Sequence, residues 1–188
     1  LVMGFGYAAK TFHVPFLQAM DAYSIAGVVS SDPAKVQGAL PGVSVYNSFE
    51  QAIGDDNFDL VVITTPNHLH AEQAEAALRA GCHVLVEKPF TLSSERAEQL
   101  VALAAQLNKQ LCVFHNRRFD GDFLTLKQLI AEQAVGNIKR LESRFDRFRP
   151  TPRKRWRENA GPGSGIFWDL GPHLIDQVVQ LFGMPQQV

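Results

Sequence analysis

The stretch Gly4-Phe5-Gly6-Tyr7-Ala8-Ala9 decides the fold, because it follows an apolar run and opens a helical pattern. In such a GxGxxA motif the first glycine permits a tight turn, and the second lets the backbone approach a pyrophosphate. A small third residue lets the helix pack closely on the sheet, and the helix N-terminus offers N–H groups to the diphosphate. The spacing therefore predicts that Gly4, Gly6 and Ala9 bind a dinucleotide, although the same letters also occur in ordinary glycine turns.

Short apolar strands alternate with helical patterns from this motif to about residue 116. Strands rich in Val, Ile and Leu are expected at 23–30, 43–46, 59–64, 83–87 and 110–115. Helices are expected at 8–20, 32–39, 49–53, 72–80 and 93–107. Near-continuous apolar strands that alternate with helices indicate a parallel sheet covered on both faces. We therefore expect an α/β fold, a doubly wound parallel Rossmann domain, over residues 1–116.

The pattern changes after residue 116. Residues 119–134 and 165–182 read as helices, and 137–148 reads as a long strand with apolar side chains on one face and alternating charges on the other. This order fits the start of an α+β substrate and dimerisation domain over 117–188. Because the chain opens directly on a strand and stops after a helix, we expect a clipped or partly ordered enzyme.

The composition is that of an ordinary globular protein. The 188 residues include 18 Lys+Arg and 19 Asp+Glu, and 46% are hydrophobic, which excludes disordered and collagen-like classes. A net charge of -1 removes the electrostatic argument for a protein that mainly binds nucleic acid or an anionic membrane. No apolar run reaches the roughly 18 residues of a membrane span, and no signal-peptide pattern opens the chain. We expect a cytoplasmic protein.

Cys82 and Cys112 lie in apolar surroundings, far apart and without CxxC spacing. This usage predicts reduced thiols inside the core rather than a disulfide or a metal site.

Ser30 and Ser31 follow the second expected strand, where an acidic residue favours NAD by binding the ribose 2′-hydroxyl and repelling a 2′-phosphate. Asp32 comes next and precedes Pro33, so it is either the N-cap of a short helix or a ribose ligand. Two serines without an acid at the strand end tolerate a phosphate. The sequence thus predicts NAD or NADP, with a slight preference for NADP, and contacts from both serines.

The motif Thr64-Thr65-Pro66-Asn67-His68-Leu69-His70 follows the fourth expected strand. Open α/β sheets bind ligands at the carboxyl ends of their strands, so this loop is placed to touch the cofactor. The alternative is an ordinary Pro-Asn turn with a histidine near the helix start. The predicted cofactor contacts in this loop are Thr65, Pro66, Asn67 and His70.

Glu87-Lys88-Pro89 ends the fifth expected strand with two adjacent charges and a proline. This position puts the Lys88 ammonium at the carboxyl edge of the sheet, beside the place expected for a nicotinamide. The alternative is a solvated ion pair at a strand end. A cis peptide before Pro89 would give a rigid turn that fixes the lysine.

Asp169 and His173 are four residues apart on the last expected helix, so they share one face. An aspartate can orient an imidazole for general acid/base transfer to an alcohol. A purely structural pair or a metal site has the same spacing, although no third ligand and no HExxH pattern is present.

These four motifs, in this order and spacing, resemble the glucose-fructose oxidoreductase / inositol dehydrogenase family (Gfo/Idh/MocA) over essentially the whole chain. Residues 9–13, 114–120 and 155–158 look like the bacterial branch that includes scyllo-inositol dehydrogenases. The resemblance implies a Rossmann domain followed by an α/β domain that carries the substrate site and often a dimer interface. It therefore implies a homodimer or higher homo-oligomer.

The resemblance also implies hydride transfer between NAD(P) and a carbinol carbon of a polyol, inositol or sugar. His173 would take the hydroxyl proton in the oxidation direction, Asp169 would orient it, and Lys88 would stabilise negative charge on the oxygen and bond the cofactor. The cofactor contacts implied by position are Gly4, Gly6, Thr65, Asn67 and Glu87. Ala9 replaces the family's third glycine, which close helix packing tolerates.

Two other classes of function are alternatives to this dehydrogenase interpretation. A non-catalytic NAD(P)-binding regulator needs the dinucleotide pocket, but the joint presence of Lys88, Asp169 and His173 argues against it. Nucleic-acid binding would use the basic segment 139–157, which holds nine Lys and Arg and two acidic residues. Its alternating signs and the lack of a reader motif favour a polar face or interface, so no nucleic-acid partner is expected.

Overall fold

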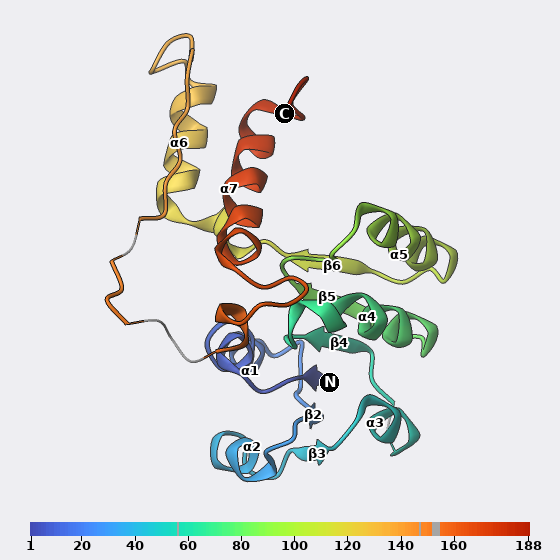
Figure 1. Ribbon diagram of the computed structural model, residues 1–188. Helices are drawn as coiled ribbons and strands as arrows, with labels where there is room; N and C mark the ends of the chain where they lie inside the picture. Colours follow the sequence, from blue (N-terminus) through green and yellow to red (C-terminus); the bar gives the residue numbers. More distant parts are fainter. Residues whose placement is uncertain (56, 147, 152–154) are drawn as a thin grey trace. The chain divides into compact units, whose positions relative to one another are not determined.

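The computed structural model describes residues 1–55, 57–146, 148–151 and 155–188 (Figure 1). It divides into two compact units, Leu1–Phe114 and His115–Val188. Among the described residues, no helix combines the length and apolar character that crossing a bilayer requires. Of the basic segment, Arg147, Arg153 and Lys154 lie outside the described residues.

The first unit is built on six parallel strands in the order β3-β2-β1-β4-β5-β6. The strands are β1 (Val2–Met3), β2 (Gly27–Val29), β3 (Ser44–Tyr46), β4 (Leu60–Ile63), β5 (His83–Glu87) and β6 (Leu111–Phe114). This is the strand order of a doubly wound dinucleotide-binding sheet, in which the connections reverse direction between β1 and β4. The predicted Rossmann fold is confirmed.

The helices of this unit are η1 (Ala9–His13, a π-helix), α1 (Val14–Ala19), α2 (Pro33–Ala39), α3 (Phe49–Asp55), η2 (Asn67–Leu69), α4 (His70–Arg79) and α5 (Ser94–Gln106). Two helices of this unit, α2 and α5, begin at side chains that cap them. The Asp32 carboxylate caps α2 by accepting from the Lys35 N–H at 3.0 Å, and the Ser93 hydroxyl caps α5 by accepting from the Arg96 N–H at 3.2 Å. The N-cap alternative for Asp32 is therefore confirmed.

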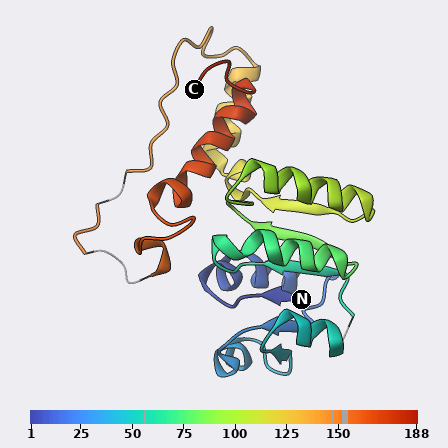
Figure 2. The same cartoon turned by 45° about the vertical axis from the view of Figure 1, so that its right-hand side comes forward.

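Two apolar cores cover the two faces of the sheet. One contains Ile63 of β4 with residues of α3, α4 and α5, such as Leu78 and Leu100. The other contains Val62 of the same strand with residues of η1, α1 and α2, such as Val36. Successive β4 side chains thus enter opposite cores, as the side-chain alternation of a strand requires. In Figure 2, the green α4 and the yellow-green α5 run alongside each other.

The second unit contains helices, as its described residues show: η3 (Asn116–Phe119), α6 (Gly121–Ala131), η4 (Trp156–Glu158) and α7 (Ile166–Phe182). The two long helices match the predicted ones. The predicted strand at 137–148 is wrong, because the described residues 137–146 and 148 form no strand. A strand needs a hydrogen-bonded neighbour, and the described part of this unit contains no other strand.

The prediction of two core thiols is half right. Cys82 is buried, its Sγ lies 3.0 Å from the Phe58 carbonyl oxygen, and burial raises the pKa of the thiol. Cys112 is exposed. On β6 the flanking Leu111 and Val113 pack against the core, so Cys112 between them points to the opposite face of this edge strand.

Candidate functional site

The glycine-rich loop leaves β1 at Gly4, in a backbone conformation that glycine adopts more readily than any other residue. Its φ is +84°, and a Cβ added there would lie 3.2 Å from Thr65 Cγ2 and 3.3 Å from the Thr64 carbonyl oxygen. A Cβ on Gly6 would meet nothing within 4 Å, so the loop is open at this point. Ala9 is fully buried and packs in the core between helix and sheet. Each residue of the motif thus meets the steric demand of a diphosphate loop.

The Thr64–His70 loop lies beside the glycine-rich loop. The Thr64 hydroxyl lies 3.0 Å from the Gly4 carbonyl oxygen and 3.1 Å from that of Met3, while the Thr65 hydroxyl donates to Gln73 on α4. Pro66 precedes η2, and Asn67 is buried at its start. The loops after β1 and β4 are therefore joined at the point where the connections of the sheet reverse.

His70 is buried, with 1% of its surface exposed. Its Nδ1 lies 2.8 Å from the Pro89 carbonyl oxygen, and its Nε2 lies 2.9 Å from the Thr65 carbonyl oxygen. The imidazole thus connects the loop after β4 with the loop after β5.

Lys88 is buried at the end of β5, with 9% of its surface exposed, and the Lys88–Pro89 peptide is cis. The preceding Glu87 places its Oε1 2.9 Å from Nε2 of His13 in η1. His13 carries no sequence signal that would identify this partner, because the two residues are 74 positions apart.

Ser30 and Ser31 follow β2 as predicted. The Ser30 hydroxyl accepts from the Asp32 N–H at 3.1 Å, and Ser31 is exposed. Asp32 is the first acidic residue after β2, and its carboxylate caps α2 through Oδ1.

The first unit fits a dinucleotide by its own steric features. The open glycine-rich loop, the Thr64–His70 loop and the buried Lys88 follow β1, β4 and β5, which are neighbours in the sheet. Carboxyl ends of parallel strands meet at one edge, and ligands bind there next to the reversal point.

Asp169 and His173 lie one turn apart on α7, as predicted, and His173 is buried. The Asp169 carboxylate accepts a hydrogen bond from Arg155 at 3.2 Å and lies 3.5 Å from Arg157 Nε. Sequence reasoning assigned no such contact to the arginines. Where the structure describes the chain, no three His, Cys, Asp or Glu side chains gather as metal ligands.

Asp176, one turn further along α7, forms a two-bond ion pair with Arg118, at 2.8 Å from Nε and 2.6 Å from Nη2. Burial acts to raise the pKa of Asp176, but the Arg118 hydrogen bonds and the charges of His115, Arg118 and His173 outweigh it and lower the pKa. Of the three predicted catalytic residues, Lys88 belongs to the first unit, whereas Asp169 and His173 belong to the second.

Two family models match this sequence. Residues 1–115 match the GFO_IDH_MocA model, described as an oxidoreductase family with an NAD-binding Rossmann fold, and residues 123–188 match the GFO/IDH/MocA C-terminal domain.

Curated relatives and solved structures agree with these matches. The chain is 52% identical over 98% of its length to the uncharacterized oxidoreductase YdgJ of Escherichia coli, and 40% identical over 100% of its length to scyllo-inositol 2-dehydrogenase (NADP(+)) IolW of Bacillus subtilis. It covers 53% and 52% of these relatives, so it spans about half their length. The putative oxidoreductase yvaA of Bacillus subtilis superposes with a TM-score of 0.90 at 40% identity, over 98% of this chain and 53% of that one. The chain belongs to the Gfo/Idh/MocA family of oxidoreductases, with an NAD-binding Rossmann fold.

Proposed function

We propose that the full-length protein is an NAD(P)-dependent dehydrogenase that transfers a hydride between the nicotinamide and a carbinol carbon of a polyol, inositol or sugar. The observation that carries the proposal is the buried Lys88 at the carboxyl edge of a dinucleotide-binding sheet. Burying an ammonium is costly unless it is paired or hydrogen-bonded, and titratable groups buried in ligand-binding clefts occur often at functional sites, so a buried lysine at this edge favours catalysis over an incidental strand end.

Lys88, His173 and Asp169 have different roles in this reaction. When bound, the nicotinamide supplies the hydride acceptor or donor. Lys88 stabilises the negative charge that develops on the substrate oxygen. His173 takes the hydroxyl proton in the oxidation direction, and Asp169, held by Arg155, orients the imidazole.

The proposed cofactor contacts come from four loops of the first unit. The glycine-rich loop would hold the diphosphate, the loop after β2 would hold the adenosine ribose, and the loops after β4 and β5 would hold the nicotinamide half. These contacts are Gly4, Gly6, Ala9, Ser30, Ser31, Thr65, Pro66, Asn67, His70, Glu87 and Lys88.

NADP is the preferred cofactor in this proposal. The end of β2 is followed by two serines and not by an acidic residue, and the Asp32 carboxylate after them accepts from the Lys35 N–H. The name of the IolW relative, 40% identical to this chain, includes NADP(+) and scyllo-inositol. Both observations support a 2′-phosphate pocket, and the relative's name supports a cyclic polyol substrate.

The test is turnover by the full-length protein. Absorbance at the reduced-nicotinamide wavelength is followed with NADP⁺ or NAD⁺ and a panel of inositols, linear polyols and aldoses. We expect turnover of at least one cyclic polyol or sugar, and a Michaelis constant lower for NADP⁺ than for NAD⁺. Tight dinucleotide binding with no turnover across the panel would instead make the protein a regulator or sensor.

A substitution at Lys88 tests the proposed role of this residue. Lys88→Met keeps the length and apolar stem of the side chain but removes the ammonium, so we expect the cofactor to bind and turnover to fall by about a hundredfold or more. The melting temperature is the control for folding, and fluorescence of the reduced cofactor follows dinucleotide binding. Near-normal turnover in Lys88→Met would refute the assignment.

A further inference from the structure

We infer that two buried histidines, His13 and His70, hold the Glu87-Lys88-Pro89 segment from its two sides and thereby position Lys88. We call this pair the histidine clamp. The inference rests on the proposed function, because it matters for activity only if Lys88 is catalytic. Both histidines position Lys88 through its neighbours in the chain, and His70 is also a proposed cofactor contact. Neither is assigned a contact with substrate.

The first half of the clamp is a direct contact between two side chains. His13 is 3% exposed, and its Nε2 lies 2.9 Å from Oε1 of Glu87, whose side chain is 13% exposed. The ring of His13 also packs against Phe114 at the end of β6, with centroids 4.4 Å apart. Since His13 belongs to η1, it joins the helix that follows the glycine-rich loop to the residue immediately before Lys88.

A π-helix at this place is informative in itself. Single turns of π-helix are rare and occur often at functional sites, because the extra residue redirects a side chain. In η1 the last residue is His13, and the α-helical geometry resumes at Val14. The change of winding thus coincides with the side chain that contacts Glu87.

The second half of the clamp uses backbone acceptors. The two ring nitrogens of His70 lie 2.8 Å from the Pro89 carbonyl oxygen and 2.9 Å from the Thr65 carbonyl oxygen. A neutral imidazole donates to one of these carbonyls, and an imidazolium donates to both. In either state the ring contacts both the residue immediately after Lys88 and the loop that follows β4, and each ring nitrogen that carries a proton donates to the carbonyl it faces.

These contacts link Lys88 to both loops proposed to hold the cofactor. Glu87 is tied to the helix after the glycine-rich loop, and Pro89 is tied to the Thr64–His70 loop. Displacing a catalytic group by about 1 Å can cost roughly a hundredfold in rate. The histidine clamp, with one contact before and one after Lys88, would therefore fix the position of the lysine relative to the cofactor.

The experiment measures Lys88 itself as well as activity, in the full-length protein. Lysine labelled with ¹³C at Cε reports the Lys88 side chain by NMR, and Lys88→Met identifies its resonance. The variants are His13→Leu and His70→Leu, with His13→Gln as the conservative form that keeps an N–H donor toward Glu87. His83→Gln is the matched control, because His83 begins the same strand and accepts from the Gln110 N–H at 2.9 Å.

We expect both leucine variants to shift the Lys88 resonance and to lower kcat by about tenfold or more. His13→Gln should return kcat to within about threefold of the parent, and His83→Gln should leave the Lys88 resonance unchanged even if it lowers the melting temperature. If His13→Leu fails to fold, Glu87→Gln provides the same measurement, because it removes the carboxylate without changing side-chain size. An unshifted Lys88 resonance in the clamp variants would overturn the inference.

The outcomes separate this inference from the proposed function. Normal turnover in Lys88→Met would refute catalysis by Lys88, yet the resonance shifts would still report whether the clamp holds the segment. Loss of turnover in Lys88→Met together with an unshifted resonance and normal kcat in the clamp variants would refute the clamp alone.

Discussion

Gly4 is the residue on which the cofactor loop depends most directly. Its φ of +84° is unfavourable for a residue with a side chain, at about 1–2 kcal/mol, and an added Cβ would also crowd the Thr64 carbonyl oxygen at 3.3 Å. We expect Gly4→Ala to lower the free energy of unfolding by at least that amount and to weaken dinucleotide binding, as measured by denaturant unfolding and cofactor fluorescence.

Gly81 supplies the matched control for this substitution. Its φ is +81°, but an added Cβ would meet nothing within 4 Å. Gly81→Ala therefore carries the backbone strain without the crowding, and it should destabilise the fold while leaving the dissociation constant for NADPH unchanged. Equal loss of dinucleotide binding in both variants would contradict a local role for Gly4.

The loop after β2 carries the proposed preference for NADP. Ser31 is exposed there, and Ser31→Asp would add a negative charge where a 2′-phosphate is expected. We expect the ratio of NADPH to NADH affinity to fall roughly tenfold, equivalent to about 1.4 kcal/mol. Ser24→Asp adds the same charge at an exposed position before β2 and should leave the ratio unchanged. An unchanged ratio in Ser31→Asp would argue against this placement.

Single residues were predictable where their role is local. Asp32 and Ser93 cap helices through N–H groups three residues away, so the sequence contains both partners of each contact. His13 was not predictable in the same way, because Glu87 is brought to it only by the order of the strands. The contacts of Asp169 with arginines escaped prediction for the same reason.

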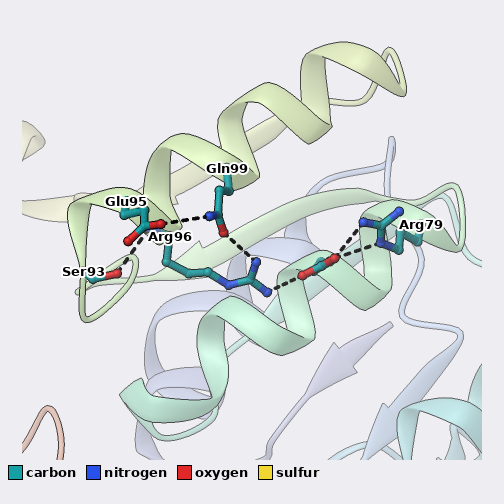
Figure 3. Close-up of polar contacts among 6 residues, drawn as sticks. Arg79, Ser93, Glu95, Arg96 and Gln99 are labelled. Carbon is teal, nitrogen blue, oxygen red and sulfur yellow. Dashed lines mark hydrogen bonds and ion pairs between the residues drawn. The ribbon is translucent and has the colours of Figure 1, made fainter.

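At the scale of elements, α4 and α5 are joined by a charged network. Glu75 of α4 accepts from Arg96 of α5 and from Arg79 at 2.9 Å, and Figure 3 shows Arg96 reaching from its helix toward α4. The hydrogen bonds from Arg96 and Arg79 hold the pKa of Glu75 below its ordinary value. This carboxylate stabilises the fold when it is ionised.

Glu75→Gln should therefore lower the free energy of unfolding at pH 7, by no more than about 1 kcal/mol because the network is partly solvated. A lowered carboxyl pKa stabilises the fold above its unfolded pKa of about 4.3, and that stabilisation is lost as the pH falls through the folded value. The difference in the free energy of unfolding between parent and variant should thus shrink below about pH 4. Thermal unfolding at several pH values, and at high salt, measures this difference.

Glu98→Gln is the control for this pH dependence, because Glu98 is an exposed glutamate on α5. It should change the melting temperature little at any pH. A Glu75→Gln effect that persists undiminished at pH 3 would mean that packing, not charge, joins the two helices.

Elements differ in how far sequence alone determines them. The apolar spacing and cap of α5 lie within its own residues, so its bounds, Ser94–Gln106, fall within the predicted 93–107. The structure of the 137–148 segment, in contrast, is not determined by its own residues. Alternating side chains there satisfy the pattern of a half-buried strand, but a strand forms only with a neighbour, and pairing is not encoded in a single segment.

At the scale of the molecule, the Rossmann unit was predictable because its signals are repeated. Several apolar strands, their helices and one glycine-rich turn point to the same sheet, so an error in any one of them leaves the fold unchanged. The proposed catalytic set is different, since Lys88 lies in one unit while Asp169 and His173 lie in the other. Sequence motifs identify its members but do not specify their mutual geometry.

Dinucleotide binding should stabilise the molecule in a pattern that follows the proposed site. At 100 times its dissociation constant, NADPH should add about 2.7 kcal/mol to the free energy of unfolding, because it binds the folded state alone. Beyond this global effect, amides that exchange by local opening should be protected only where the ligand lies. Hydrogen exchange of the full-length protein should therefore slow most at residues 4–9, 30–32, 64–70 and 87–89.

Adenosine 2′,5′-bisphosphate separates the two ends of that site, because it has the adenosine and the 2′-phosphate but no nicotinamide. It should slow exchange at residues 30–32 and leave 87–89 near the rate of the free protein, whereas NADPH should slow both. Protection of 87–89 by the fragment as strongly as by NADPH would mean that the Lys88 segment responds to global stabilisation and not to the nicotinamide. Protection confined to NADPH would place that segment at the reacting end of the cofactor.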